Sequence, residues 1–235
     1  MFDAGSGIRN LGRDLIARGQ EQYENIYIGF SHFHWDHIHG FPFFQPAYDA
    51  RRHFTISAIG KGRSAMNLRE IFATQMLPVY FPVALDQMGA KFSFHQSETD
   101  DFIANGVKVT VAEHNHPGGT YGYRIEDIDG KVLVYCTDVE HGDTIDRRVV
   151  QLAKDADFLI HDAQYTPTEL KGKKGWGHSS WEQAIEVAER AGAKQLALTH
   201  HDPDHDDAFL LQVEKECQKR FPNALLAREK MEIEF

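Results

Sequence analysis

The sequence has few cysteines and no long apolar run. Only two cysteines, Cys136 and Cys217, occur in 235 residues, which excludes a disulfide framework and a thiolate zinc cluster. No apolar run is long enough to cross a bilayer, so no membrane partner is expected. The chain does not open with a basic region followed by an apolar one, so we expect no signal peptide and take the cytoplasm as the default location.

Positive charge is also scarce. Lysine and arginine total 25 against 35 acidic residues, which gives a formal net charge of −10. This balance argues against a large non-specific nucleic-acid footprint. It does not exclude an anionic substrate, because bound metal ions dominate the charge inside a site. The length, with no repeat or linker, predicts a single domain over residues 1–235.

Histidine, by contrast, is abundant, with 14 residues, and the segment 31–37 reads Ser-His-Phe-His-Trp-Asp-His. An apolar, strand-like run at 25–30 precedes it and Gly40-Phe41-Pro42 follows, so it is predicted to be a loop at a strand end. Imidazole and carboxylate both bind zinc and its neighbours. Four such groups cannot reach one ion from so short a segment, so two ions fit better. These candidate ligands are His32, His34, Asp36 and His37.

Other histidines and aspartates also follow predicted strands. The strands predicted at 107–112, 131–136, 156–160 and 195–199 lead into His114 and His116, Asp138, Asp162, and His200 and His201, respectively. His178 precedes a helix predicted to start with a capping box of Ser179 and Glu182 and to end at Gly192. A helix N-terminus is a favourable place for an anion. Because nearly all candidates lie at strand ends, one domain explains their convergence.

The remaining pattern predicts an α/β fold, since strands and helices alternate in the second half. We expect helices near 8–16, 68–76 and from 207, further strands at 54–60 and 91–94, and a hairpin over 121–136. The aromatic residues 41–44 are expected to pack in the core, with lining of the site as the alternative. The proline-spaced segment 77–83 is expected to be extended, as a flap or as a homodimer contact.

The sequence His-x-His-x-Asp-His after a strand resembles the signature of the metallo-β-lactamase superfamily, and Asp3 resembles the turn aspartate that supports its metal loop. The resemblance implies an αββα sandwich that lacks the family's first strands. It also implies two divalent metal ions, with zinc expected and manganese or iron as alternatives. It assigns His32, His34 and His116 to one ion, Asp36, His37 and His200 to the other, and Asp138 to both. His114 and His201 are the alternatives to His116 and His200.

The aspartate at the bridging position resembles the phosphodiesterase side of the superfamily, which includes ribonuclease Z. The resemblance implies that His178, supported by Asp162, contacts the phosphate and protonates the leaving group. Asp36 would orient or deprotonate the attacking water. The family acid is commonly glutamate, so Asp162 departs from the pattern.

Without a long basic insertion, a small phosphodiester such as a cyclic nucleotide is the predicted substrate. The alternatives are RNA, a lactam, lactone or thioester, and a metal-stabilised binding protein without catalysis.

Overall fold

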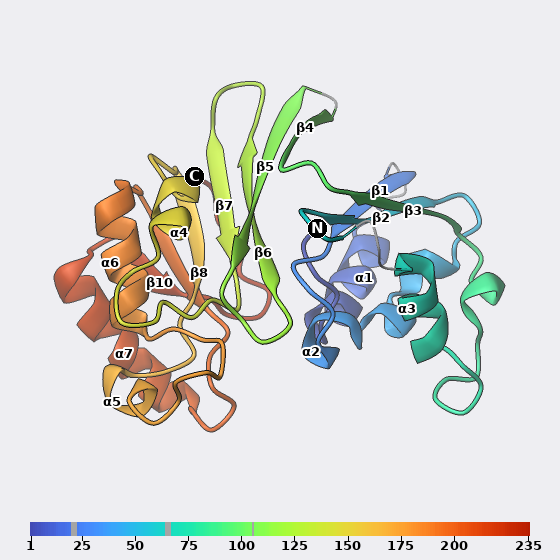
Figure 1. Ribbon diagram of the computed structural model, residues 1–235. Helices are drawn as coiled ribbons and strands as arrows, with labels where there is room; N and C mark the ends of the chain where they lie inside the picture. Colours follow the sequence, from blue (N-terminus) through green and yellow to red (C-terminus); the bar gives the residue numbers. More distant parts are fainter. Residues whose placement is uncertain (20–22, 64–66, 105) are drawn as a thin grey trace. The chain divides into compact units, whose positions relative to one another are not determined.

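The computed structural model describes residues 1–19, 23–63, 67–104 and 106–235 (Figure 1). The chain divides into two compact units, residues 1–99 and 100–235, called here the N-terminal and C-terminal units. Each unit has its own cluster of buried apolar side chains. Among the described residues, no helix is long and apolar enough to cross a membrane.

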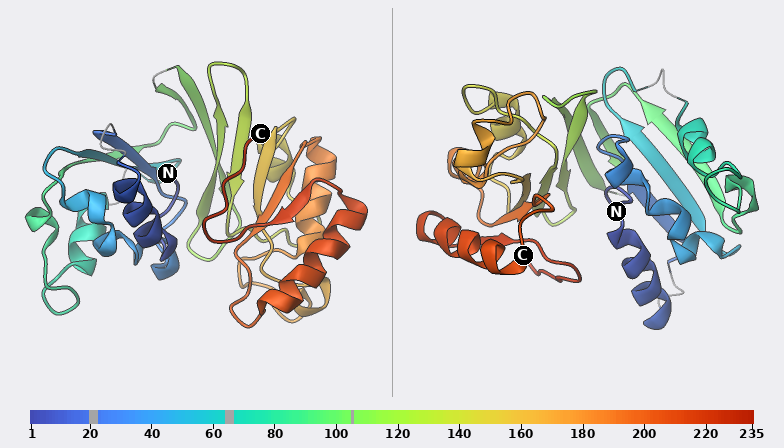
Figure 2. Two further views of the ribbon diagram at one scale, coloured as in Figure 1. Left: turned by 180° about the vertical axis from the view of Figure 1, so that it is seen from behind. Right: turned by 90° about the horizontal axis from the view of Figure 1, so that it is seen from below.

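The N-terminal unit contains a parallel three-stranded sheet in the order β1-β2-β3. Its strands are β1 (Asn25–Gly29), β2 (His53–Ile59) and β3 (Lys91–Ser97). Its helices are α1 (Gly7–Ala17), α2 (Trp35–Ile38) and α3 (Leu68–Gln75), with 3-10 turns η1 (Phe41–Phe43), η2 (Gln45–Tyr48) and η3 (Leu85–Gln87). The helices lie on one side of this sheet (Figures 1 and 2). Phe2 adds a parallel bridge to Gly29, so the chain begins alongside β1.

Aromatic side chains fill much of the core of this unit. The ring of Phe72 on α3 lies 5.0 Å from that of Phe30 and 4.8 Å from that of Phe41, measured between centroids. Phe41 and Phe44 are fully buried, whereas Phe43 is half exposed. The expectation that this aromatic run packs the core is therefore confirmed for Phe41 and Phe44.

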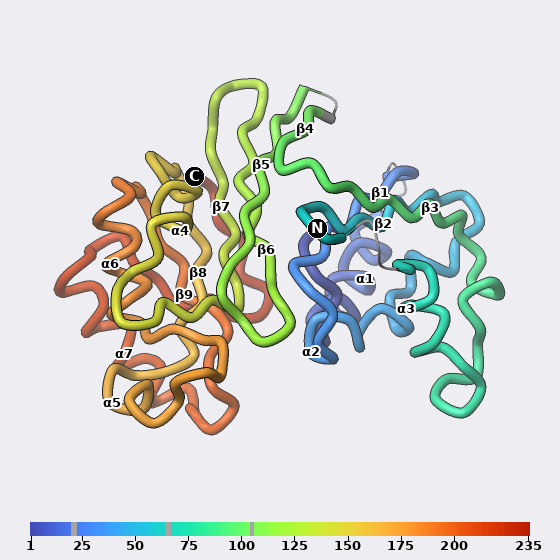
Figure 3. The backbone as a smooth tube through the Cα atoms, viewed as in Figure 1, coloured from blue at the N-terminus to red at the C-terminus, as the bar shows by residue number. Residues whose placement is uncertain are grey.

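The C-terminal unit contains a seven-stranded mixed sheet in the order β10-β9-β8-β7-β6-β5-β4. The antiparallel part is β4 (Asp101–Ala104), β5 (Val107–His114), β6 (Thr120–Glu126) and β7 (Val132–Cys136). The predicted hairpin is confirmed as β6 and β7, and the chain trace shows the tight connection between them (Figure 3). The strands β8 (Phe158–Asp162), β9 (Leu196–Thr199) and β10 (Ala224–Leu226) continue the sheet in parallel with β7.

Helices cover one face of this sheet (Figures 1 and 2). They are α4 (Arg147–Leu152), α6 (Trp181–Ala191) and α7 (Asp207–Arg220), while the short α5 (Pro167–Leu170) lies in a connection. Because β7, β8 and β9 are parallel neighbours, their carboxyl ends meet at one edge of the sheet. Asp138, Asp162 and His200 therefore fall at the same edge, as expected from the sequence.

Two local predictions were wrong, and two short strands were not predicted. The capping box of α6 consists of Ser180 and Gln183 rather than Ser179 and Glu182, because Ser179 uses its amide and hydroxyl elsewhere. The segment expected to be extended at 77–83 begins with a turn, in which the amides of Tyr80 and Phe81 both donate to the carbonyl of Leu77. The short edge strands β4 and β10 were not predicted, because three- and four-residue strands carry little pattern.

Replacing Phe72 with alanine tests the aromatic core. The side chain is fully buried against four rings, so Phe72→Ala is expected to lower the free energy of unfolding by about 3–5 kcal/mol. Phe43→Ala, which removes the same atoms from a half-exposed position, is the matched control and should cost less than half as much. Denaturant unfolding of both variants gives the comparison, and equal losses would contradict this packing.

Candidate metal centre and its supporting residues

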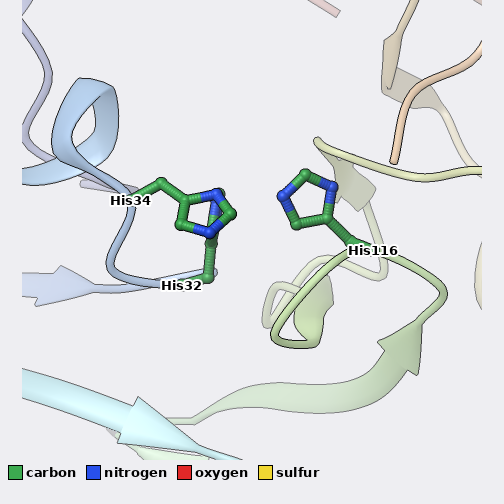
Figure 4. Close-up of side chains that lie close together, drawn as sticks. All are labelled: His32, His34 and His116. Carbon is green, nitrogen blue, oxygen red and sulfur yellow. The ribbon is translucent and has the colours of Figure 1, made fainter. Parts of the chain in front are cut away.

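The N-terminal unit holds four candidate ligands on one short segment. His32 and His34 lie on the loop after β1, and the Nε2 atom of His32 is 3.0 Å from the Nδ1 atom of His34 (Figure 4). Asp36 and His37 follow in α2, where the Nε2 atom of His37 is 3.2 Å from a carboxylate oxygen of Asp36. His32 and His37 are buried, whereas the side chain of Asp36 is 57% exposed. The segment thus presents three imidazoles and one accessible carboxylate together.

Asp3 lies beneath this loop and holds it. Its carboxylate accepts hydrogen bonds from the amide and hydroxyl of Ser31, at 2.8 Å each, and from Nδ1 of His37 at 2.9 Å. Since the Ser31 hydroxyl donates to Asp3, it accepts from Nδ1 of His32 at 3.0 Å. Both rings are then in the tautomer whose Nε2 atom carries the lone pair, which is the form that binds a metal ion.

The C-terminal unit places Asp138 between two histidines. One carboxylate oxygen is 3.7 Å from Nε2 of His116, and the other is 3.6 Å from Nε2 of His200. Asp138 is buried, and its backbone has φ 50°, as His200 has φ 60°. Such left-handed conformations are uncommon outside glycine and cost about 1–3 kcal/mol, and they concentrate at functional sites. The two oxygens of Asp138 are therefore directed to different imidazoles.

Asp162 and His178 form a second pair beside Asp138. Nδ1 of His178 donates to Asp162 at 2.8 Å, and the other oxygen of Asp162 accepts from the amide of Ser179 at 2.8 Å. A parallel bridge between Tyr165 and Ser180 brings the two segments together. One ligand atom from each of Asp138, Asp162, His178 and His200 lies within 4.8 Å of the others. Asp162 thus reaches His178, although its side chain is shorter than the glutamate that is common at this position of the family.

Glu140 holds the segment before His178. Its carboxylate accepts from the amides of Gly175 and Gly177, each at 2.8 Å in the shortest contact. The carbonyl of Gly177 in turn accepts from Nδ1 of His116 at 2.9 Å, which leaves the lone pair on Nε2. Gly177 has φ 90°, and a Cβ atom there would overlap the His116 ring. No pattern in the sequence reveals that Glu140 and Gly177 support the candidate ligands.

Three further histidines, His114, His141 and His161, are buried away from these clusters. Burial lowers the pKa of His114 and of His141 to about 3, and it lowers that of His161 as well, so all three are neutral. His114 packs against Gly122, where a Cβ atom would overlap its ring. His114 and His201 lie in none of the candidate metal groups of the described residues. Within the C-terminal unit, His116 and His200 are the histidines whose Nε2 atoms lie beside the carboxylate of Asp138, at 3.7 and 3.6 Å.

The donor set fits a divalent metal ion. Imidazole nitrogen and carboxylate oxygen are ligands for zinc, iron and manganese. The tautomers of His32, His37 and His116 are fixed by hydrogen bonds from their Nδ1 atoms, as is usual for metal-binding histidines. Each unit therefore presents imidazole and carboxylate groups that are suited to bind a divalent metal ion.

Comparisons with known proteins agree with this chemistry. Residues 1–201 match the β-lactamase superfamily domain. The ribonuclease Z of Synechococcus sp. (strain CC9311) is 25% identical over 298 aligned positions, which cover all of this chain and 88% of that protein. Among solved structures, the metallo-β-lactamase fold protein YhfI from Bacillus subtilis aligns with a TM-score of 0.67 at 20% identity, covering 97% of this chain and 83% of that one. A diphosphatase of the PhnP family aligns with a TM-score of 0.66 at 20% identity, covering 100% of this chain and 79% of that one.

The chain belongs to the β-lactamase superfamily, whose members are typically metal-dependent hydrolases. The predicted fold class is confirmed, since both units combine a sheet with helices and the structural neighbours have the metallo-β-lactamase fold. A relationship to ribonuclease Z, expected from the motif, is confirmed as well.

The role of Glu140 can be tested with a matched pair of buried carboxylates. Glu140→Gln places an amide group against backbone donors, and we expect zinc affinity to fall about 10–100-fold, as for other groups that support ligands. Asp157→Asn is the control, because Asp157 also accepts a backbone amide, that of Val132, but touches none of the candidate ligands. Zinc affinity is measured by competition with a chromophoric chelator.

Both variants are expected to lose about 1–3 kcal/mol of unfolding free energy, measured without metal. If Asp157→Asn weakened zinc binding as much as Glu140→Gln does, the effect would be one of stability, and the role given to Glu140 would be wrong.

Proposed function

We propose that the two ligand sets form one binuclear metal centre within a single metallo-β-lactamase-like domain over residues 1–235. His32, His34 and His116 would hold one ion, Asp36, His37 and His200 the other, and Asp138 both. Two observations support this assignment. The superfamily match spans every one of these residues, and the oxygens of Asp138 are directed to His116 and His200.

Two divalent ions at such a centre supply Lewis acidity and a hydroxide nucleophile at neutral pH. Asp36, whose carboxylate is exposed, is suited to orient or deprotonate the attacking water. Zinc is the proposed metal, with manganese and iron as alternatives, because the donors are nitrogen and oxygen throughout.

We infer phosphodiester hydrolysis mainly from the pair formed by Asp162 and His178. Asp162 fixes the His178 ring through Nδ1, which leaves Nε2 to hold a proton or to contact a phosphate oxygen. The His178 ring stacks on that of His200, with centroids 4.8 Å apart and planes at 17°, so Nε2 lies beside the candidate ligands. A histidine in this position can protonate a departing alkoxide.

The proposed substrate is a small phosphodiester such as a cyclic nucleotide, handled in the cytoplasm. The net charge of −10 supports a small substrate over a long polyanion. RNA is the second candidate, because the matched relatives are named ribonuclease Z. Leu77, Val79 and Tyr80 are exposed, and a homodimer contact through them remains a prediction.

Metal stoichiometry tests the shared carboxylate. Elemental analysis of metal-replete protein should give close to two ions per chain. Asp138→Ala is expected to reduce that number to one or fewer, because it removes the only group assigned to both ions. Asp202→Ala, which removes a nearby carboxylate outside the assigned set, should keep both. One ion per chain in the unmodified protein, with no change on Asp138→Ala, would contradict the binuclear centre.

A substrate panel tests the reaction class. Zinc- and manganese-loaded protein is expected to hydrolyse bis(p-nitrophenyl) phosphate and at least one cyclic nucleotide, with little or no turnover of a β-lactam or a thioester. Lactam or thioester hydrolysis without phosphodiester turnover would overturn the proposal, whereas preference for precursor tRNA would select the RNA alternative.

In the same panel, His178→Ala should keep its metal and lose about 10²–10⁴-fold in turnover of the cyclic nucleotide. The loss should be smaller for the nitrophenyl ester, whose leaving group needs little protonation. His205→Ala is the control, since His205 pairs with Glu169 outside the candidate groups.

A further inference from the structure

A tryptophan two residues before His178 is exposed to solvent on a loop whose backbone amides are hydrogen-bonded. Trp176 is 58% exposed, although tryptophan is seldom left so open on a folded domain. Its neighbours Gly175 and Gly177 both donate their amides to Glu140, and its own amide donates to the carbonyl of Lys173 at 3.1 Å. Three consecutive backbone amides are thus bonded within the unit. The backbone that carries the exposed indole is therefore fixed.

Lys173 lies between two aromatic rings on this loop. Its ammonium nitrogen is 4.1 Å from the centroid of the Trp176 ring and 5.6 Å from that of Tyr165. Both separations lie within the range of cation–π attraction. Among the described residues, no carboxylate forms an ion pair with Lys173, whereas the adjacent Lys174 pairs with Asp143. The ammonium group is therefore held in place by rings, and its charge is not neutralised by an acid.

The same rings connect this loop to the proposed catalytic pair. The Tyr165 ring lies 6.1 Å from the His178 ring in an edge-on arrangement. Lys173 thus contacts the ring of Tyr165, which in turn contacts the ring of His178, and the same ammonium group contacts the ring of Trp176. A cation and an exposed indole therefore lie in the same aromatic cluster as the group proposed to contact the scissile phosphate.

We propose that Tyr165, Lys173 and Trp176 form a nucleotide subsite, in which Trp176 stacks on the nucleobase and Lys173 attracts a phosphate oxygen. The proposal rests on the proposed phosphodiesterase function and names its substrate class as a nucleoside phosphodiester. A base stacks on an aromatic side chain irrespective of its identity, so the subsite would accept several bases. An ammonium ion binds phosphate as a point charge without requiring one orientation.

Two esters with the same leaving group isolate this subsite from the chemistry at His178. One is p-nitrophenyl thymidine 5′-phosphate, and the other is methyl p-nitrophenyl phosphate, which lacks a nucleoside. The ratio of their kcat/KM values reports recognition of the nucleoside. Trp176→Ala is expected to lower this ratio roughly 5- to 150-fold, and Trp176→Phe to restore most of it. Ile128→Ala, which truncates another exposed apolar side chain of the same unit, should leave it unchanged.

A binding measurement gives a readout that does not depend on turnover. Calorimetry on the metal-free protein should show that Trp176→Ala and Lys173→Met both weaken binding of thymidine 5′-monophosphate. Lys173→Met should also reduce the salt dependence of that binding, whereas Ile128→Ala should change neither quantity.

The outcomes separate the subsite from the proposed function. Turnover of neither ester by the unmodified protein would refute the function, and thymidine 5′-monophosphate binding would then decide the subsite alone. Turnover of both esters, with ratio and affinity unchanged by Trp176→Ala, would leave the function intact and refute the subsite. Equal losses on both esters would mean that Trp176 only stabilises the loop, which also refutes it.

Discussion

The carboxylate of Asp138 is the group on which the proposed centre most depends. It is buried, and its two oxygens are directed to His116 and to His200. A buried carboxylate is costly unless hydrogen bonds or cations compensate it, and a positive φ adds to that cost. The hydroxyl of Thr137 donates to one oxygen of Asp138, and the two metal ions of the proposed centre would add to that compensation.

Hydrogen bonds around the ligands select one form of each imidazole. Asp3 and Ser31 do so for His37 and His32, and the Gly177 carbonyl does so for His116. Glu140 holds Gly177, and through it both His116 and the segment that leads to His178. In the C-terminal unit, strand ends therefore bring Asp138, Asp162 and His200 to one edge of the sheet. In both units, buried carboxylates then orient candidate side chains. Loss of such a carboxylate should weaken the site without removing a ligand.

The sequence was most informative where chemistry and periodicity coincide. His32, His34, Asp36 and His37 form a motif that few other functions require, and strand-end positions identified Asp138, Asp162 and His200. Supporting groups were harder to predict, because Glu140 acts through backbone amides 35 and 37 residues away and its side chain has no local pattern. The capping box was predicted one residue too early because Ser179 and Ser180 both fit the pattern. They are distinguished by the hydrogen bonds that Ser179 donates, from its amide to Asp162 and from its hydroxyl to the carbonyl of Val139.

The central claim is that ligands from both units hold the same pair of metal ions. Anomalous diffraction from crystals of the zinc-loaded protein tests it directly, because it locates each ion independently of the assigned roles. The account predicts two zinc peaks, one bound by His32, His34 and His116, the other by Asp36, His37 and His200, with Asp138 contacting both. A single peak, or zinc bound by residues of one unit alone, would contradict it.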